Sequence, residues 1–188
     1  MTQSKNQDMI DDLMSDPEVV IVDDEEQVAE LNRHRVEEVG YTTETAFGGQ
    51  QALDVISTNT DVVLLDRRMP KMSGDEVLKE IHDIGYNCQI IMVTAVDPDM
   101  EITGMSFDDY ISKPVGRDTL IQAVRKQMNI KQLNIVTNNI LSTESKIEVL
   151  EQNNPKSSLE NEDEYNDLKR DLKELSTKKK QLEKAVKD

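Results

Sequence analysis

Residues 62–70, VVLLDRRMP, decide the fold of this chain and raise its first chemical question. Four branched apolar residues in a row are typical of a strand that is buried on both faces of a parallel sheet. The run nevertheless ends on a carboxylate, Asp66, and an unpaired buried charge is strongly destabilising. Asp66 is therefore expected at the mouth of its strand, where water or other charges compensate it.

Short apolar runs alternate with amphipathic stretches from Glu18 to about Ile130. The predicted strands are 18–23, 41–46, 62–66, 89–95 and 109–113, and the predicted helices are 25–39, 50–57, 74–84, 99–105 and 117–130. Five such repeats predict an α/β fold, a doubly wound five-stranded parallel sheet of flavodoxin-like order with helices on both faces.

The last third of the chain has a different pattern. Steps of three and four join Tyr165, Leu168, Leu172, Leu175, Lys179, Leu182 and Val186. A second such stripe, which Thr143-Glu144 interrupts, contains Leu133, Val136, Ile140, Ile147 and Leu150. Polar residues and Pro155 predict a loop at about 153–163. These stripes predict an antiparallel helical hairpin or coiled coil, whose first helix continues from 117–130.

Composition limits the classes of function. The 38 acidic and 22 basic residues give a net charge of -16, which argues against broad binding to nucleic acid or anionic membranes. No apolar run approaches the length of about 18 residues that a membrane span needs. Residues 1–16 lack a signal pattern and are expected to form a mobile acidic tail. Cys88 is alone, so no internal disulfide is expected, and the location is expected to be cytoplasmic.

Carboxylates follow the predicted strands in a way that implies a site. In this fold the first and third strands are neighbours, and ligands bind at the carboxyl ends of the strands. Asp23 and Asp24 would therefore meet Asp66, together with Thr94 after the fourth strand and Lys113 after the fifth. Three such carboxylates repel one another unless a hard cation such as Mg2+ binds among them. A carboxylate in this setting can accept a phosphoryl group.

The stretches VIVDDEE, LLDRRMPKMSGDEVL, IIMVTA and YISKP resemble the receiver domain of two-component response regulators, over about residues 17–130. The resemblance implies that Asp66 accepts a phosphoryl group from a sensor histidine kinase. It implies a Mg2+ site formed by Asp23, Asp24, Asp66 and the backbone carbonyl of Arg68. It also implies that Thr94, Lys113 and Tyr110 are the switch hydroxyl, the phosphate-pairing lysine and the rotating aromatic residue, which act on a face at 96–116.

Residues 131–188 are similar to the HalX domain, a helical module attached to receivers in halophilic archaea, on the pattern KIEVLEQ and LENEDEYNDLKRDLKEL. This resemblance implies a haloarchaeal source. These residues carry 11 basic and 12 acidic side chains and no glycine. They therefore favour dimerisation or protein interaction over a DNA-binding helix-turn-helix, although nucleic-acid binding stays open as the alternative. A homodimer through the receiver or through these helices is also possible.

Simpler interpretations stand beside these. An Asp-Asp pair before a helix is often only an N-cap, and Tyr110 could be a core residue. Arg67-Arg68 could be solvated or could steer phosphodonors, whereas His34 and His82 are expected on the surface. An aspartate-nucleophile phosphohydrolase is a further alternative, but that class needs a second aspartate where this chain has Arg68. The chain is therefore expected to be a phosphoacceptor switch and not an enzyme.

Overall fold

The computed structural model describes residues 18–95 and 103–187, and these residues form two compact units, one ending at Met128 and the other beginning at Asn129. The tail predicted at 1–16 lies outside the described residues. So does most of the helix predicted at 99–105, of which Thr103 and Gly104 form a short 3₁₀ turn.

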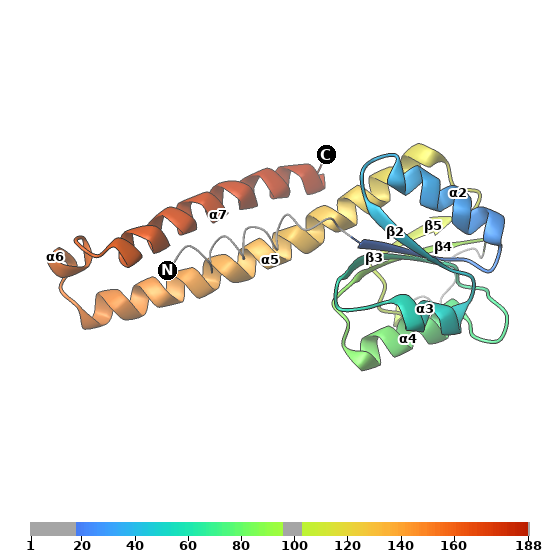
Figure 1. Cartoon of the computed structure of the whole chain (residues 1–188), viewed down its shortest axis with the longest axis horizontal. Helices are drawn as coiled ribbons and strands as arrows, with labels where there is room; N and C mark the ends of the chain where they lie inside the picture. The colour runs from blue at the N-terminus through green and yellow to red at the C-terminus, as the bar shows by residue number, and fades with distance from the viewer. Residues whose placement is uncertain (1–17, 96–102, 188) are drawn as a thin grey trace. The chain divides into compact units, whose positions relative to one another are not determined.

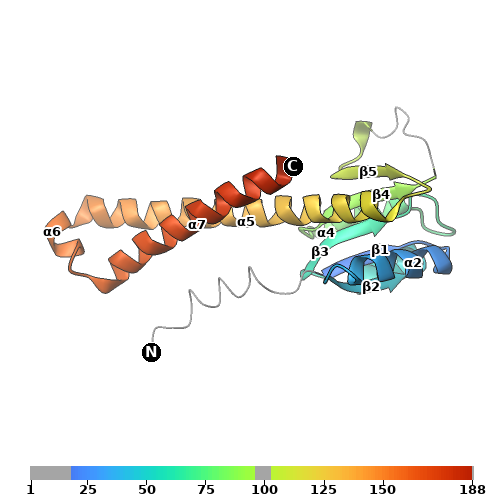
Figure 2. The same ribbon diagram turned by 90° about the horizontal axis from the view of Figure 1, so that it is seen from above.

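The first unit is built on a parallel sheet. Its strands are β1 (Glu18–Val22), β2 (Thr42–Ala46), β3 (Thr60–Leu65), β4 (Gln89–Thr94) and β5 (Asp109–Ser112). Figure 2 shows them in the order β2-β1-β3-β4-β5. All four neighbouring pairs are parallel. The doubly wound sheet expected from the sequence is thus confirmed, and β1 and β3 are neighbours as expected.

Helices cover both faces of the sheet (Figure 1). They are α2 (Glu26–Glu37), α3 (Gly49–Val55), α4 (Gly74–Ile84) and the first part of α5 (Arg117–Asn153). Side chains alternate along β3, so Val63 and Leu65 pack in the cluster that includes α3 and α4. Val62 and Leu64 pack on the other side, in the cluster that includes α2 and α5. A strand with both faces buried explains its unbroken apolar run.

Local signals set the limits of α4. The Ser73 side chain accepts a hydrogen bond from the Glu76 backbone N–H, and the Glu76 carboxylate accepts one from the Ser73 backbone N–H, which forms a capping box. The helix ends at Gly85, whose φ of 86° is left-handed and suits glycine. Because α4 begins eight residues after Asp66, this cap also fixes the end of the loop that follows the carboxylate.

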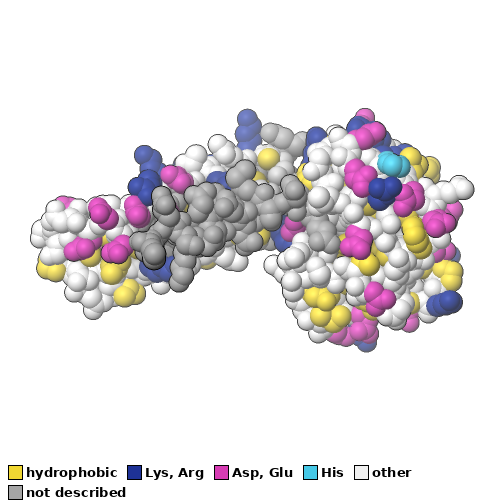
Figure 3. All heavy atoms as spheres, in the orientation of Figure 1, with side chains coloured by type: hydrophobic (Ala, Val, Ile, Leu, Met, Phe, Trp, Pro, Cys, Tyr) yellow, Lys and Arg dark blue, Asp and Glu magenta, His cyan; other side chains and the backbone are white. Residues whose placement is uncertain are grey.

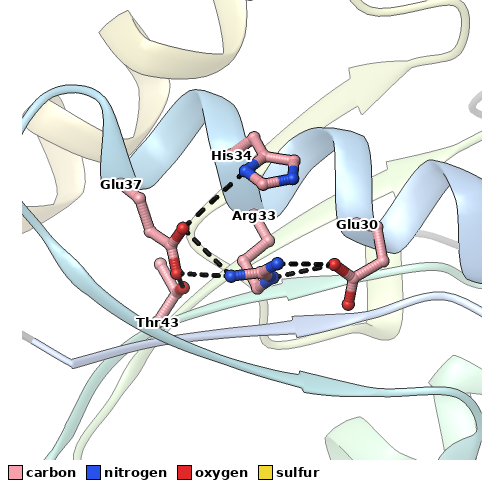
Figure 4. Close-up of polar contacts among 5 residues, drawn as sticks. All are labelled: Glu30, Arg33, His34, Glu37 and Thr43. Atoms are coloured by element: carbon pink, nitrogen blue, oxygen red, sulfur yellow. Dashed lines mark hydrogen bonds and ion pairs between the residues drawn. The ribbon is translucent and has the colours of Figure 1, made fainter.

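A surface network joins α2 to the edge strand β2 (Figure 4). Arg33 lies between Glu30 and Glu37, with N–O distances of 2.7 and 2.8 Å. Thr43 donates to Glu37 over 2.8 Å, and His34 lies 3.9 Å from Glu37. His34 and His82 are both exposed, as expected. Water and salt screen exposed pairs of this kind, so they contribute little to stability.

The second unit contains the rest of α5, the short helix α6 (Lys156–Leu159) and α7 (Asp163–Lys187). The two long helices expected after residue 130 are therefore present, and α5 runs without interruption from Arg117 to Asn153. Figure 1 shows α6 at the connection between them. The predicted loop at 153–163 is thus partly helical. The antiparallel hairpin or coiled coil stays a prediction.

A small apolar cluster lies at this connection. Ile147, Leu159 and Tyr165 are buried together, and partly buried residues of α5 and α7 pack against them. The Tyr165 hydroxyl donates to Glu151 over 2.5 Å, and Lys169 lies 3.3 Å from the same carboxylate. The Lys169 ammonium also lies 4.6 Å from the centre of the Tyr165 ring. These contacts join the end of α5 to the beginning of α7.

The interruption expected at Thr143-Glu144 is wrong for Thr143. Its side chain is buried, with 6% exposed, and it continues the spacing of the buried Val136, Ile140 and Ile147. A threonine methyl group can occupy an apolar face when the hydroxyl finds a local partner, and α-helices offer such partners in the carbonyls one turn back. Among the described residues, no helix is both long and apolar enough to span a membrane.

Candidate functional site

Asp23 and Asp24 follow directly on β1. The Asp23 backbone N–H donates to the Ala46 carbonyl over 3.1 Å, which extends the pairing with β2 by one residue. The Asp23 side chain is buried, with 3% of the residue exposed, and its Oδ1 accepts the backbone N–H of Glu25. Asp24 is exposed. The N-cap residue of α2 is Glu25, which has no side-chain cap, so the N-cap interpretation of the Asp-Asp pair is wrong. Asp23 forms a local turn before the helix, and its Oδ2 pairs with Lys113.

Asp66 follows β3 in the same way. Its backbone N–H donates to the Val22 carbonyl over 2.9 Å, so the ends of β1 and β3 are in register. The residue is 7% exposed, and its Oδ1 accepts the backbone N–H of Arg68 over 3.3 Å. The strand therefore delivers a nearly buried carboxylate whose other oxygen, Oδ2, needs a charged partner.

Lys113 provides that partner. Its Nζ lies 2.8 Å from Asp66 Oδ2 and 2.7 Å from Asp23 Oδ2, and its side chain is 15% exposed. The Lys113 backbone N–H donates to the Thr94 carbonyl over 2.8 Å, which anchors the residue at the end of β4. One ammonium thus bridges two carboxylates from different strands, and this pairing compensates the charge that ends the run at 62–66.

The surroundings raise the pKa of both Asp23 and Lys113, for different reasons. Burial raises the pKa of the Asp23 carboxyl, and it outweighs the hydrogen bond from Lys113, which acts to lower that pKa. Burial acts to lower the pKa of Lys113, but the hydrogen bonds with Asp23 and Asp66 and the negative charges of these two acids together outweigh burial, so the pKa of Lys113 is raised. The ammonium is therefore firmly charged, whereas the charge on Asp23 is costly.

The three acidic side chains can hold a cation. Asp23, Asp24 and Asp66 each offer an oxygen, and these oxygens lie within 4.8 Å of one another. An all-oxygen set with one exposed member fits Mg2+, which prefers carboxylate oxygens and retains several waters. The Arg68 backbone lies beside these carboxylates, because its N–H donates to Asp66 Oδ1.

Thr94 and Tyr110 lie on the neighbouring strands. Thr94 is the last residue of β4 and is fully buried. Tyr110 lies on β5 with its ring half-buried, 5.6 Å from the Phe107 ring between centroids. Tyr110 also packs against the core cluster on the α3 and α4 side of the sheet. This packing agrees with the core interpretation of Tyr110. The first part of the expected 96–116 face, residues 96–102, lies outside the described residues.

The loop after Asp66 contains two features that the sequence did not indicate. Arg67 is buried, with 7% exposed, and its Nε lies 3.1 Å from both carboxylate oxygens of Asp75 on α4. Arg67 is thus neither solvated nor available to steer phosphodonors, whereas Arg68 is exposed. In addition, Gly74 passes so close to Asp66 that a β-carbon at Gly74 would lie 2.2 Å from the Asp66 carbonyl oxygen.

Comparison with known proteins adds to this geometry. The sequence profile of the response regulator receiver domain matches residues 19–125. A candidate transcriptional regulator of Haloferax volcanii is 44% identical over 108 residues, which are 57% of this chain and 19% of that protein. The transcriptional regulatory protein DltR of Streptococcus agalactiae is 36% identical over 111 residues, which are 57% of this chain and 50% of that protein. The chain thus spans between a fifth and a half of the length of these relatives.

Solved structures are similar over the same part of the chain. A CheY-like receiver domain protein of Methanospirillum hungatei is 26% identical, with a TM-score of 0.59, and the match covers 63% of this chain and 98% of that one. The response regulator TrrA of Thermotoga maritima, solved in complex with Mg(2+)-BeF, is 34% identical, with a TM-score of 0.54. That match covers 59% of this chain and 98% of the other.

Proposed function

The chain belongs to the receiver domain family of response regulators, and from this premise we propose that it accepts a phosphoryl group on Asp66 from a sensor histidine kinase. The observation that supports the proposal most is the pair of short contacts from Lys113 to Asp66 and Asp23, at 2.8 and 2.7 Å. Lys113 already pairs with both acids, so its ammonium is placed to pair with a phosphoryl group that Asp66 accepts.

The chemistry is a transfer between two protein side chains. A carboxylate oxygen of Asp66 forms a bond to phosphorus while the bond from phosphorus to the kinase histidine nitrogen breaks. Lys113 stabilises the negative charge on the transferred group, and Thr94 offers its hydroxyl as a hydrogen-bond donor. Asp23, Asp24, Asp66 and the Arg68 carbonyl would hold Mg2+, which neutralises phosphoryl oxygens when it is bound.

Labelling on Asp66 tests this function. The chain is incubated with Mg2+ and acetyl phosphate, or with a phosphorylated histidine kinase, and the product is recognised as an acyl phosphate by its cleavage with hydroxylamine. Asp66→Asn should abolish the label, as should chelation of Mg2+. Asp83→Asn, which changes an exposed carboxylate on α4, is the matched control and should be labelled normally. A label that persists in Asp66→Asn would refute the assignment.

The response to phosphorylation would be a shift between two populations of one face of the domain. In this proposal Thr94 turns toward the phosphoryl group, Tyr110 changes its packing, and the face at 96–116 changes with them. The half-buried ring of Tyr110 is consistent with such a change, because a partly exposed aromatic side chain can alter its packing at a smaller cost than a fully buried one.

The domain arrangement follows from this function. The receiver would comprise residues 17–130, behind a mobile acidic tail at 1–16, and a HalX-like helical hairpin at 131–188 would form the output, with its connection at about 153–163. A homodimer through the receiver or the C-terminal helices would transmit the signal. The haloarchaeal source, the HalX assignment and the cytoplasmic location stay predictions. Similarity to a Haloferax volcanii protein supports the first of these.

DNA binding through the C-terminal helices is the second candidate function, because the relatives named above include described transcriptional regulators. Charge argues against direct contact, since residues 131–188 have nearly balanced charges. Where Figure 3 shows described side chains, acidic and basic groups lie interspersed. A gel-shift assay with genomic fragments, with and without phosphodonor, separates DNA binding from protein interaction. A phosphohydrolase is disfavoured because Arg68 stands where such an enzyme needs an acid.

A further inference from the structure

Arg35 on α2 reaches the segment that carries Lys113. Its Nη1 donates to the side-chain oxygen of Asn32 over 3.1 Å and to the backbone carbonyl of Val115 over 3.2 Å. Asn32 lies one turn back on α2 and is buried, with 3% exposed, so it fixes the direction of the guanidinium. Val115 lies two residues after Lys113. This hydrogen bond therefore connects α2 to the backbone of the segment that follows Lys113.

The other contacts of segment 113–117 include the packing of the partly buried Val115 side chain against the core cluster on the α2 and α5 side of the sheet. The Lys113 backbone N–H bonds to the Thr94 carbonyl before the segment leaves the sheet. Pro114 has no N–H to donate. Arg117 pairs with Glu38 over 3.0 Å, but the side chains are 48% and 61% exposed, so this pair is screened and weak. The contact of Arg35 is less exposed and charge-assisted, which makes it the stronger hold on the segment.

The same helix also contacts the acidic side of the site. The backbone N–H of Glu25, immediately before α2, donates to Asp23 Oδ1 over 3.1 Å. α2 thus contacts an acid of the site near its first residue and the segment behind Lys113 near its last turn. The 12-residue helix thus connects the turn at Asp23 with the segment that carries Lys113.

We infer that Arg35 is a positioning residue, which holds the Val115 carbonyl so that the Lys113 ammonium stays between Asp23 and Asp66. The inference rests on the proposed function, since it concerns the lysine that would pair with the phosphoryl group. Without Arg35, the Val115 carbonyl loses its charged donor, and the segment keeps the Lys113 backbone hydrogen bond, the packing of Val115 against the core and the exposed Arg117 pair. Lys113 then spends less time in the geometry that phosphoryl transfer needs.

The experiment measures the rate constant of labelling by acetyl phosphate in the full chain, at several Mg2+ concentrations. Arg35→Ala should lower the maximal rate constant about five-fold, the equivalent of about 1 kcal/mol in a barrier. Arg35→Lys, which retains a charged donor, should recover part of the loss. A merely structural role would reduce the amount of protein that can be labelled, but it would leave the rate constant of the folded molecules unchanged.

Arg33→Ala is the matched control. Arg33 lies on the same helix, and its guanidinium pairs with Glu30 and Glu37 of that helix (Figure 4). Its removal should leave the rate constant within about two-fold of wild type, because exposed pairs contribute little. An equal loss in Arg33→Ala and Arg35→Ala would overturn the inference, since it would indicate a general effect of weakening α2.

A double-mutant cycle with Lys113→Ala gives the decisive comparison. If Arg35 acts through Lys113, Arg35→Ala should change the rate less than about two-fold in the Lys113→Ala background. A five-fold loss in both backgrounds, or none in the wild-type background, would overturn the role of Arg35 and leave the proposed function intact. Failure of the wild-type chain to be labelled on Asp66 would instead overturn the proposed function, and this inference with it.

Discussion

Replacing Gly74 with alanine should disturb both the stability of the first unit and its site. An alanine β-carbon would lie 2.2 Å from the Asp66 carbonyl oxygen, 2.9 Å from the Arg67 Cα and 3.0 Å from the Asp66 carbonyl carbon. Ordinary contact begins at 3.4 Å, so the nearest atom must move by about 1.2 Å. All three atoms belong to the backbone, so no side-chain rotation can relieve the overlap.

The magnitude follows from two opposing effects. Overpacking that forces a backbone shift typically costs up to about 3 kcal/mol. Gly74 is the first residue of α4, and the better helix propensity of alanine recovers at most about 1 kcal/mol. We therefore expect Gly74→Ala to lower the free energy of unfolding by about 2 kcal/mol, or the melting temperature by about 4–8 °C for a chain of this size.

Urea unfolding followed by circular dichroism measures the stability effect, and labelling by acetyl phosphate measures the effect on the site. Because the shift falls on the backbone of Asp66, the labelling rate of the folded variant should drop by about 10- to 100-fold. Gly48→Ala is the control, since a β-carbon there meets nothing within 4 Å. A Gly74→Ala variant within about 0.5 kcal/mol of wild type and labelled at the normal rate would refute the reasoning.

Two further predictions concern the charged site and the second unit. Because the pKa of Lys113 is raised above its ordinary 10.5, its ammonium contributes stability that is complete below that pH and is lost as the pH rises through the folded-state pKa. The difference in unfolding free energy between wild type and Lys113→Met should therefore shrink in urea titrations above about pH 10.5, and a pH-independent difference would contradict the raised pKa. Tyr165→Ala should destabilise the second unit by about 3 kcal/mol, because it removes a buried ring packed on Ile147 and Leu159. Limited proteolysis should then cut near α6 sooner, while Asp66 is labelled at the wild-type rate; slower labelling would contradict the separation of the two units.

The sheet was predictable because its strands are short, buried runs that hydrophobic pattern alone distinguishes. In the sheet, Val62 and Val63 of β3 pair with residues of both β1 and β4. Each predicted strand boundary differs from the boundary in the structure by at most two residues. The meeting of Asp23, Asp24 and Asp66 was equally predictable, because parallel strands bring their carboxyl ends to one edge. These inferences need only the order of strands and no knowledge of side-chain packing.

The contacts around the site were harder to predict, because they join residues whose separation in sequence carries no periodic signal. Arg35 meets Val115 across 80 positions, and its only sequence feature is its place near the end of a helix. Arg67 is a second example, since a charged residue after Asp66 suggests exposure. Arg67 is buried because Asp75 of α4 lies 3.1 Å from its guanidinium, and this ion pair offsets the free-energy cost of removing the charge from water.

The second unit shows a different limit of sequence reasoning. Steps of three and four identify which positions of α5 and α7 need to be covered, but they do not identify what covers them. At the end of α5, part of that cover comes from the connection, because Leu159 of α6 is 5% exposed and packs with Ile147 and Tyr165. A polar stretch that contains Pro155 predicts a solvated turn, yet its single leucine lies in the cluster that joins the two helices. Leu159 is therefore the position at which a substitution should separate α5 from α7 with the least effect on either helix alone.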